Sequence, residues 1–176
     1  MLTKKEEDMN IQMEFISESE LADESFSIVI DGLKPRETYR VEMFLSDYYC
    51  INAPMLLAHD DLWKSTATFV SDKNGIIDMS ETPSCSGSYE GISTMGLFFN
   101  AKPLTNKRKK LPNSLSKIPL LDHFFVDIKI MQGNTVIAER TFTRHYMSSQ
   151  ISHQDIYGKH FQGRLFYDKK AIKAPA

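Results

Sequence analysis

Apolar side chains alternate with polar or small ones along several segments of the chain. The alternating apolar positions are Phe26, Ile28 and Ile30; Tyr39, Val41, Met43 and Leu45; Phe124, Val126, Ile128 and Ile130. Trp63, Ala67 and Phe69 continue the same pattern. Because successive side chains of a strand point to opposite faces, a period of two predicts half-buried β-strands. No apolar stripe with a period of 3.6 residues is long enough to predict a major helix.

Turn signals separate the predicted strands. After Phe69, the residues Lys73-Asn74-Gly75 favour the positive φ angles of a tight hairpin, and we expect Ile77 to begin the returning strand. A second hairpin is predicted from Ile128–Met131, a Gln132-Gly133-Asn134 turn and Thr135–Ala138.

Further strands are predicted over Gln12–Ile16, Gln150–Ile156 and His160–Tyr167, with Gly158 between the last two. About seven to nine strands result, which is typical of an all-β, immunoglobulin-like antiparallel sandwich. We expect its core to contain Trp63, Phe69, Ile28, Val41, Val126 and Ile128. The segment from Ser80 to Pro119, rich in Gly, Ser, Pro and Lys, is predicted to be one long irregular loop. Within that loop we expect 105–116 to be mobile.

Composition favours a single domain without a strong electrostatic preference. The 176 residues are 41% hydrophobic and 25% charged, with a net charge of −2 and a pI near 6.2. These values argue against nucleic acid or an anionic membrane as a partner. The basic run Lys107–Lys110 has three interpretations: a nuclear import signal, a phosphate-binding patch, or, as we favour, a solvated loop tip.

The first ten residues are charged and are predicted to be a flexible N-terminus. They lack the apolar core of a signal peptide, and the chain contains no apolar run of the ~20 residues that span a bilayer. We therefore expect an intracellular, cytoplasmic protein without a membrane span. Cys50 and Cys85 are then most simply free thiols, with a disulfide between them as the alternative.

The search for catalytic groups yields no assembled site. The segment Gly87-Ser88-Tyr89-Glu90-Gly91 has a serine between glycines, but not in the Gly-x-Ser-x-Gly spacing of a nucleophile elbow. Cys85 has no predicted helix N-terminus or basic partner that would activate it. The histidines lack metal-ligand spacing, and His59-Asp60-Asp61 is better explained as a turn than as a cation site. We expect no catalytic residue, no metal site and no cofactor in this chain.

One block of the sequence resembles a known family. It runs Trp63–Phe69, Asp72–Asp78, Gly87-Ser88-Tyr89-Glu90-Gly91 and Met95-Gly96-Leu97-Phe98. Flanking it, Leu21–Glu24, Gly32–Pro35, Arg144 and Gly163–Phe166 extend the likeness over roughly residues 11–168. The chain resembles the N-terminal domain of the acyl-CoA thioester hydrolase and bile acid-CoA:amino acid N-acyltransferase family. Phe99 stands where many members have tryptophan.

The resemblance implies a two-domain enzyme of fatty acid metabolism. An N-terminal β-sandwich would precede an α/β-hydrolase domain that carries a serine or cysteine nucleophile, an aspartate and a histidine. This chain would contribute residues 11–168 as the sandwich and 169–176 as the start of a linker, as a fragment of a cytoplasmic acyl-CoA thioesterase or acyltransferase. The alternative is a free-standing immunoglobulin-like interaction module.

The resemblance also implies a docking surface for the hydrolase domain. We assign it to Ser88, Tyr89, Met95, Gly96, Leu97 and Phe98, because these glycine-flanked apolar side chains follow no strand alternation. The competing interpretation is that the same side chains plug one end of the sandwich.

Overall fold

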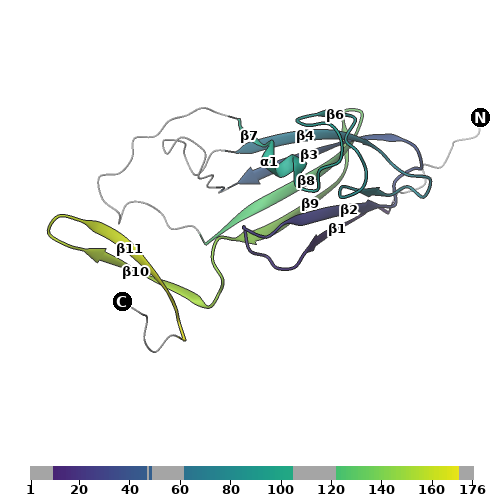
Figure 1. Ribbon diagram of the computed structural model, residues 1–176. Helices are drawn as coiled ribbons and strands as arrows, with labels where there is room; N and C mark the ends of the chain where they lie inside the picture. The colour runs from purple at the N-terminus through teal and green to yellow at the C-terminus, as the bar shows by residue number, and fades with distance from the viewer. Residues whose placement is uncertain (1–9, 47, 49–61, 105–121, 171–176) are drawn as a thin grey trace, which may run out of the picture.

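The computed structural model describes residues 10–46, 48, 62–104 and 122–170. Its elements are β1 (Gln12–Ser17), β2 (Phe26–Asp31), β3 (Thr38–Ser46), β4 (Trp63–Val70), β5 (Ile77–Asp78), β6 (Ser86–Gly87), α1 (Gly96–Phe99), β7 (Lys102–Pro103), β8 (His123–Gln132), β9 (Thr135–His145), β10 (Ile151–Tyr157) and β11 (Gln162–Asp168). Eight of the strands are six residues or longer, and β5, β6 and β7 have two residues each. The predicted all-β class is therefore confirmed (Figure 1).

The larger sheet has the order β6-β4-β3-β8-β9, and β7 also pairs with β4. All its strand pairs are antiparallel, with Val41 of β3 opposite both Ala67 of β4 and Ile130 of β8. Burial alternates residue by residue along β3 and β4, so that one face of the sheet is apolar. The opposite face carries ion pairs such as Lys64–Glu42 at 2.9 Å.

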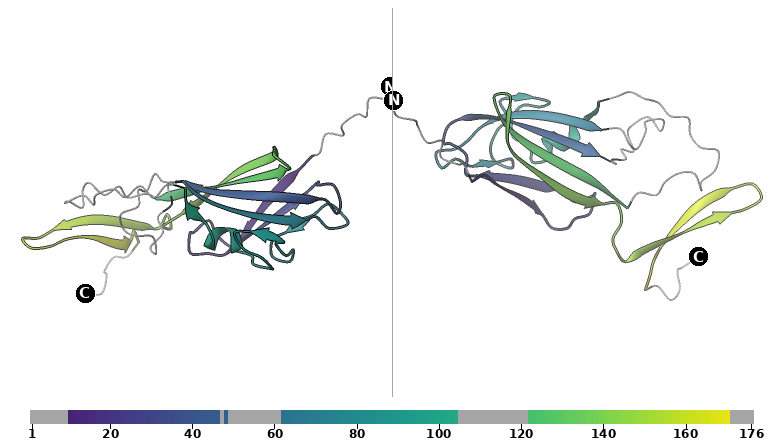
Figure 2. Two further views of the ribbon diagram at one scale, coloured as in Figure 1. Left: turned by 90° about the horizontal axis from the view of Figure 1, so that it is seen from above. Right: turned by 180° about the vertical axis from the view of Figure 1, so that it is seen from behind.

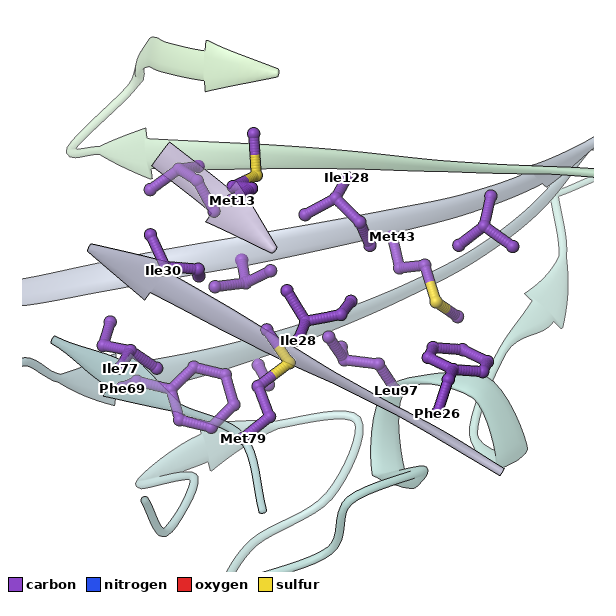
Figure 3. Close-up of a cluster of buried hydrophobic side chains, with 14 of the residues drawn as sticks. Met13, Phe26, Ile28, Ile30, Met43, Phe69, Ile77, Met79, Leu97 and Ile128 are labelled. Carbon is purple, nitrogen blue, oxygen red and sulfur yellow. The ribbon is translucent and has the colours of Figure 1, made fainter. Parts of the chain in front are cut away.

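The smaller sheet has the order β1-β2-β5 and lies over the apolar face of the larger one, which gives the two layers seen in Figures 1 and 2. Side chains of both sheets meet between the layers, as Figure 3 shows for Ile28 and Ile30 of β2 beside Met43 and Ile128. The six side chains predicted for the core all lie in this one cluster, each at most 7% exposed. An antiparallel sandwich is thus confirmed, while its immunoglobulin-like connectivity stays a prediction.

The hairpin expected at Lys73-Asn74-Gly75 is wrong. Ile77 does not return beside β4 but pairs with Ile30 of β2, in the other sheet. The Asp72 carboxylate accepts hydrogen bonds from the backbone N–H groups of Asn74 and Ile76, both at 2.8 Å. These bonds, which also lower the pKa of Asp72, bend the chain into a corner that joins the two layers.

The other predicted strands agree with the structure to within a few residues. β8 and β9 form the second predicted hairpin, with a register shift between Ile130 and Met131. The expected loop from Ser80 contains three short elements, β6, α1 and β7, before Leu104. Its predicted mobile part and the basic run Lys107–Lys110 lie outside the described residues. No helix of the described part is long and apolar enough to cross a membrane.

Candidate functional site

The Gly87–Phe99 loop, which carries the candidate docking residues, begins at the edge of the larger sheet. Gly87 has a φ of 124°, and a Cβ on it would lie 2.9 Å from the Cα of Ala67, so only glycine fits. The Ser88 N–H donates to the carbonyl of Thr66 at 2.6 Å, and the Ser88 hydroxyl oxygen accepts from the Thr66 N–H at 3.0 Å. Ser88 therefore holds the loop against β4.

Ser84 closes the first half of this loop. Its backbone N–H and carbonyl exchange hydrogen bonds with those of Gly91, both at 2.9 Å, and Gly91 has a φ of 85°. The buried Ser84 hydroxyl lies 3.0 Å from the Ser86 carbonyl and 2.9 Å from the Tyr89 carbonyl. Ser88 thus sits in a clamped turn, whereas a nucleophile elbow needs a strand-to-helix turn.

Tyr89 packs on Gly96, which starts α1. A Cβ at position 96 would lie within 2.5 Å of the ring carbon Cε2, so the ring occupies the space that any other residue would need. Tyr89 is half-buried, and this burial raises the pKa of its phenol to about 12. The contact joins the two halves of the loop.

Met95 and Leu97 point into the core from either side of Gly96. They are 9% and 4% exposed and belong to the same apolar cluster as the sheet residues. The Met95 sulfur accepts a hydrogen bond from the backbone N–H of Phe26 at 3.3 Å, and Leu97 lies near Phe26 in Figure 3. These two side chains fill the space between the layers, as the plug interpretation requires.

Phe98 is half-buried at the rim of the same cluster. Its ring meets Phe26 and Tyr48 edge-on, with centroids 5.7 Å and 5.3 Å away, and lies 6.2 Å from Phe124. Such edge-to-face pairs add to the stability gained from apolar burial. Phe98 thus connects α1 to both sheets.

The structure brings the six predicted residues together but divides them by exposure. Met95, Gly96 and Leu97 are buried, Tyr89 and Phe98 are half-buried, and Ser88 is exposed. The most exposed apolar side chains of the loop are instead Ile92 and Phe99, at 62% and 75%. Sequence reasoning missed both as surface residues. Phe99 was missed because a one-turn helix that turns Phe98 inward and Phe99 outward leaves no recognisable period.

A second arrangement that sequence reasoning missed is centred on Arg144 of β9, which is 1% exposed. Its guanidinium donates to Ser17 Oγ at 3.1 Å and to the carbonyls of Ser19 at 2.8 Å, Glu24 at 2.6 Å and Leu21. It also lies over the rings of Phe15 and Phe26, 5.4 Å and 5.2 Å from their centroids. Arg144 therefore holds the connection between β1 and β2 against β9.

Burial lowers the pKa of Arg144, and the negative charges of Asp23, Glu24 and Glu20 oppose that effect. Three backbone carbonyl oxygens and the Ser17 hydroxyl accept its hydrogen bonds, and the guanidinium remains charged because arginine is not deprotonated in proteins. Its contacts run inward, to the backbone of its own chain, which makes a structural role the simplest one.

Candidate metal ligands are scattered. Among the described residues, no group of three or more His, Cys, Asp or Glu side chains could hold a metal ion. The Asp122 carboxylate pairs with His123 at 2.5 Å, which lowers the pKa of Asp122, and Glu20 lies 3.6 Å from His145. Cys85 is a free, exposed thiol. The predicted turn His59-Asp60-Asp61 lies outside the described residues.

Comparison with protein families gives one match, to the family described as the acyl-CoA thioester hydrolase/BAAT N-terminal region, over residues 23–157. That span runs from before β2 to the end of β10, so it contains the Gly87–Phe99 loop and Arg144.

Curated relatives point in the same direction. Mouse acyl-coenzyme A amino acid N-acyltransferase 2 is 28% identical over 112 residues, which cover 64% of this chain and 24% of the relative. Human bile acid-CoA:amino acid N-acyltransferase is 25% identical over 166 residues, which cover 89% and 36%. Mouse acyl-coenzyme A thioesterase 5 is 23% identical over 149 residues, which cover 82% and 32%. The matches thus span between about a quarter and a third of these relatives.

Proposed function

Because the chain belongs to the acyl-CoA thioester hydrolase/BAAT family, whose N-terminal region it matches, we propose that it forms the non-catalytic N-terminal domain of an enzyme that acts on acyl-CoA. The family match over residues 23–157 carries this proposal. The fold agrees with it, since an antiparallel sandwich offers none of the strand-to-helix turns on which α/β-hydrolases place their nucleophile.

The proposed reaction of the whole enzyme is acyl transfer from CoA. A nucleophile in a second domain attacks the thioester carbonyl, the CoA thiolate leaves, and the acyl-enzyme passes its acyl group to water or to an amino acid. The relatives include proteins named for each outcome, thioesterases and amino acid N-acyltransferases. Residues outside the described domain decide between them.

We propose that the partner of this domain is an α/β-hydrolase domain of the same polypeptide, and that the enzyme works in the cytoplasm. The proposed domain order is the one expected from the sequence: a charged N-terminal segment, the sandwich, and then the second domain. The share of the relatives that this chain matches, 24–36%, is consistent with a second domain of larger size.

The docking surface that we propose is the exposed rim of the Gly87–Phe99 loop. Phe99 and Ile92 supply exposed apolar side chains, Tyr89 and Phe98 of the same loop are half-buried, with the Phe98 ring 6.0 Å from that of Phe99, and Ser88 adds a polar edge. Met95, Gly96 and Leu97 support this surface from below, so the plug and docking interpretations apply to different members of one loop. An apolar centre with a polar rim is the usual composition of such contacts.

The test is an assay of the protein encoded by the complete reading frame. With long-chain and short-chain acyl-CoA esters, CoA release is followed with a thiol reagent, with and without glycine as acyl acceptor. The proposal predicts CoA release that is abolished when the predicted nucleophile of the second domain is replaced by alanine. Release of no CoA from any ester would contradict it.

A further inference from the structure

The hairpin formed by β10 and β11 is a separate two-stranded sheet. Its strands pair with each other from Ile151↔Asp168 to Tyr157↔Gln162, and no other strand of the described residues pairs with either. Both views of Figure 2 and Figure 1 show it extending away from the sandwich. A two-stranded hairpin alone is at best marginally stable in water, so this one needs further packing partners.

Both faces of the hairpin carry large apolar side chains. Cross-strand partners share a face, so Ile156, Leu165 and Tyr167 lie on one side, and Tyr157 and Phe166 lie on the other. These five side chains are 38–56% exposed. In β3, by contrast, every second residue is buried and the others face the polar side. The hairpin therefore lacks the one-sided pattern of the sandwich strands.

Apolar side chains on both faces are typical of strands in α/β sheets, which helices cover from both sides. A second copy of this chain would not provide such cover. Two hairpins joined edge to edge would satisfy backbone groups along one edge, yet both faces of the four-stranded sheet would stay exposed. A flat docking surface would cover one face alone.

The sandwich ends before the hairpin begins. The ring of Tyr146, the residue after β9, still packs on Phe124 of the core, with centroids 5.1 Å apart. The hairpin then closes its own base, where the N–H of Lys169 donates to the Gln150 carbonyl at 2.8 Å and its Nζ donates to Ser149 at 2.9 Å. The boundary between the two units therefore lies between Tyr146 and Ile151.

Resting on the proposed function, we propose that residues 151–168 are the first two strands of the catalytic domain's sheet rather than the last two of the sandwich. An outer edge of this hairpin, which pairs with no described strand, joins the sheet of the α/β-hydrolase domain by backbone hydrogen bonds. Helices of that domain then cover Leu165 from one side and Phe166 from the other. The cross-strand ion pair between Arg164 and Asp155, at 2.6 Å, fixes the register of the two strands and neutralises both charges.

Hydrogen–deuterium exchange tests this inference in the 176-residue chain and in the protein of the complete reading frame. In the 176-residue chain, the amides of 151–168 should exchange at least ~100-fold faster than those of β3 and β8, and the protein should be monomeric. In the longer protein the same amides should become protected. Protection of the hairpin in a monomeric 176-residue chain would overturn the inference, and protection only in a dimer would assign the role to a second copy.

Paired variants of the longer protein add a second test. Leu165→Asp and Phe166→Asp change opposite faces, and each should speed exchange of the hairpin amides at least ~10-fold while β8 stays protected. Lys159→Gln, at an exposed position in the turn between the two strands, is the control and should leave the exchange of the hairpin and of β8 unchanged. No acceleration by either apolar variant would contradict the inference.

The two proposals fail separately. If the longer protein releases CoA from acyl-CoA while the amides of 151–168 exchange as fast as in the 176-residue chain, the sheet assignment is wrong and the proposed function stands. If those amides are protected and no ester is cleaved, the sheet assignment stands and the proposed function is wrong.

Discussion

The ring of Tyr89 lies where a side chain on Gly96 would have to begin, with Cε2 within 2.5 Å of the Cβ position. Gly96 does not have a positive φ, so its conformation alone would admit alanine. It is the packed ring that excludes a methyl group, and this contact fixes α1 relative to the turn at Ser88.

Gly96→Ala should therefore destabilise the domain by overpacking, by about 1–3 kcal/mol in urea unfolding. In the double variant with Tyr89→Ala, most of the cost of the added methyl should disappear, because the ring that it meets is gone. Gly163→Ala, which meets no atom within 4 Å, is the control and should stay within ~0.5 kcal/mol. Equal costs of Gly96→Ala with and without the Tyr89 ring would refute the contact.

Tyr89 also predicts a pH effect. Its pKa is about 12 in the folded protein and near 10 when unfolded, because burial disfavours the phenolate. The stability linked to this proton is complete below pH 10 and is lost as the pH rises from 10 to 12. The fall in unfolding free energy over that range should be smaller in Tyr89→Phe than in the unchanged protein, and identical pH profiles would show that the phenol is not buried.

Arg144→Met should cost about 3 kcal/mol of unfolding free energy, because several carbonyl acceptors around the guanidinium lose a charged donor in a buried place. Arg144→Lys keeps the charge but loses the planar fork, so its cost should be intermediate. Lys129→Met removes an exposed ion pair with Glu139 at 3.6 Å and serves as the control, with a change below ~0.5 kcal/mol. If Arg144→Met lowers the unfolding free energy no more than the control does, Arg144 does not hold the β1–β2 connection against β9.

Trp63→Ala should cost roughly 3–5 kcal/mol, as for other buried aromatic residues. The indole is 7% exposed and meets the ring of Tyr48 edge-on at 5.5 Å. Phe99→Ala, at a 75% exposed site, should leave the stability of the 176-residue chain within ~0.5 kcal/mol. A cost below ~1 kcal/mol for Trp63→Ala would place this residue outside the core.

The sequence was sufficient for the strands, since a period of two reflects burial of one sheet face. It was insufficient where one local signal is compatible with more than one path of the chain. Asn74-Gly75 predicts a turn correctly, but the Asp72 carboxylate decides that the turn crosses to the other sheet. The direction depends on side-chain hydrogen bonds that no periodicity records.

The candidate site shows the same limit. The apolar run Met95-Gly96-Leu97-Phe98 was recognisable, yet which members face the core depends on a one-turn helix too short to show a period. Arg144 was noted only for its likeness to the family, because a buried arginine that binds carbonyls has no sequence signature. The hairpin strands were predicted correctly, but their separation from the sandwich depends on pairing partners far apart in sequence.

The central claim is that this chain serves an acyl-CoA enzyme without performing its chemistry. The most direct measurement is thiol release from acyl-CoA esters by the purified 176-residue chain. We predict CoA release no faster than in buffer. Of the two candidate nucleophiles in this region, Ser88 lies in a clamped turn and Cys85 lies on an exposed loop. Turnover that Ser88→Ala or Cys85→Ala abolishes would contradict the account and make this loop an active site.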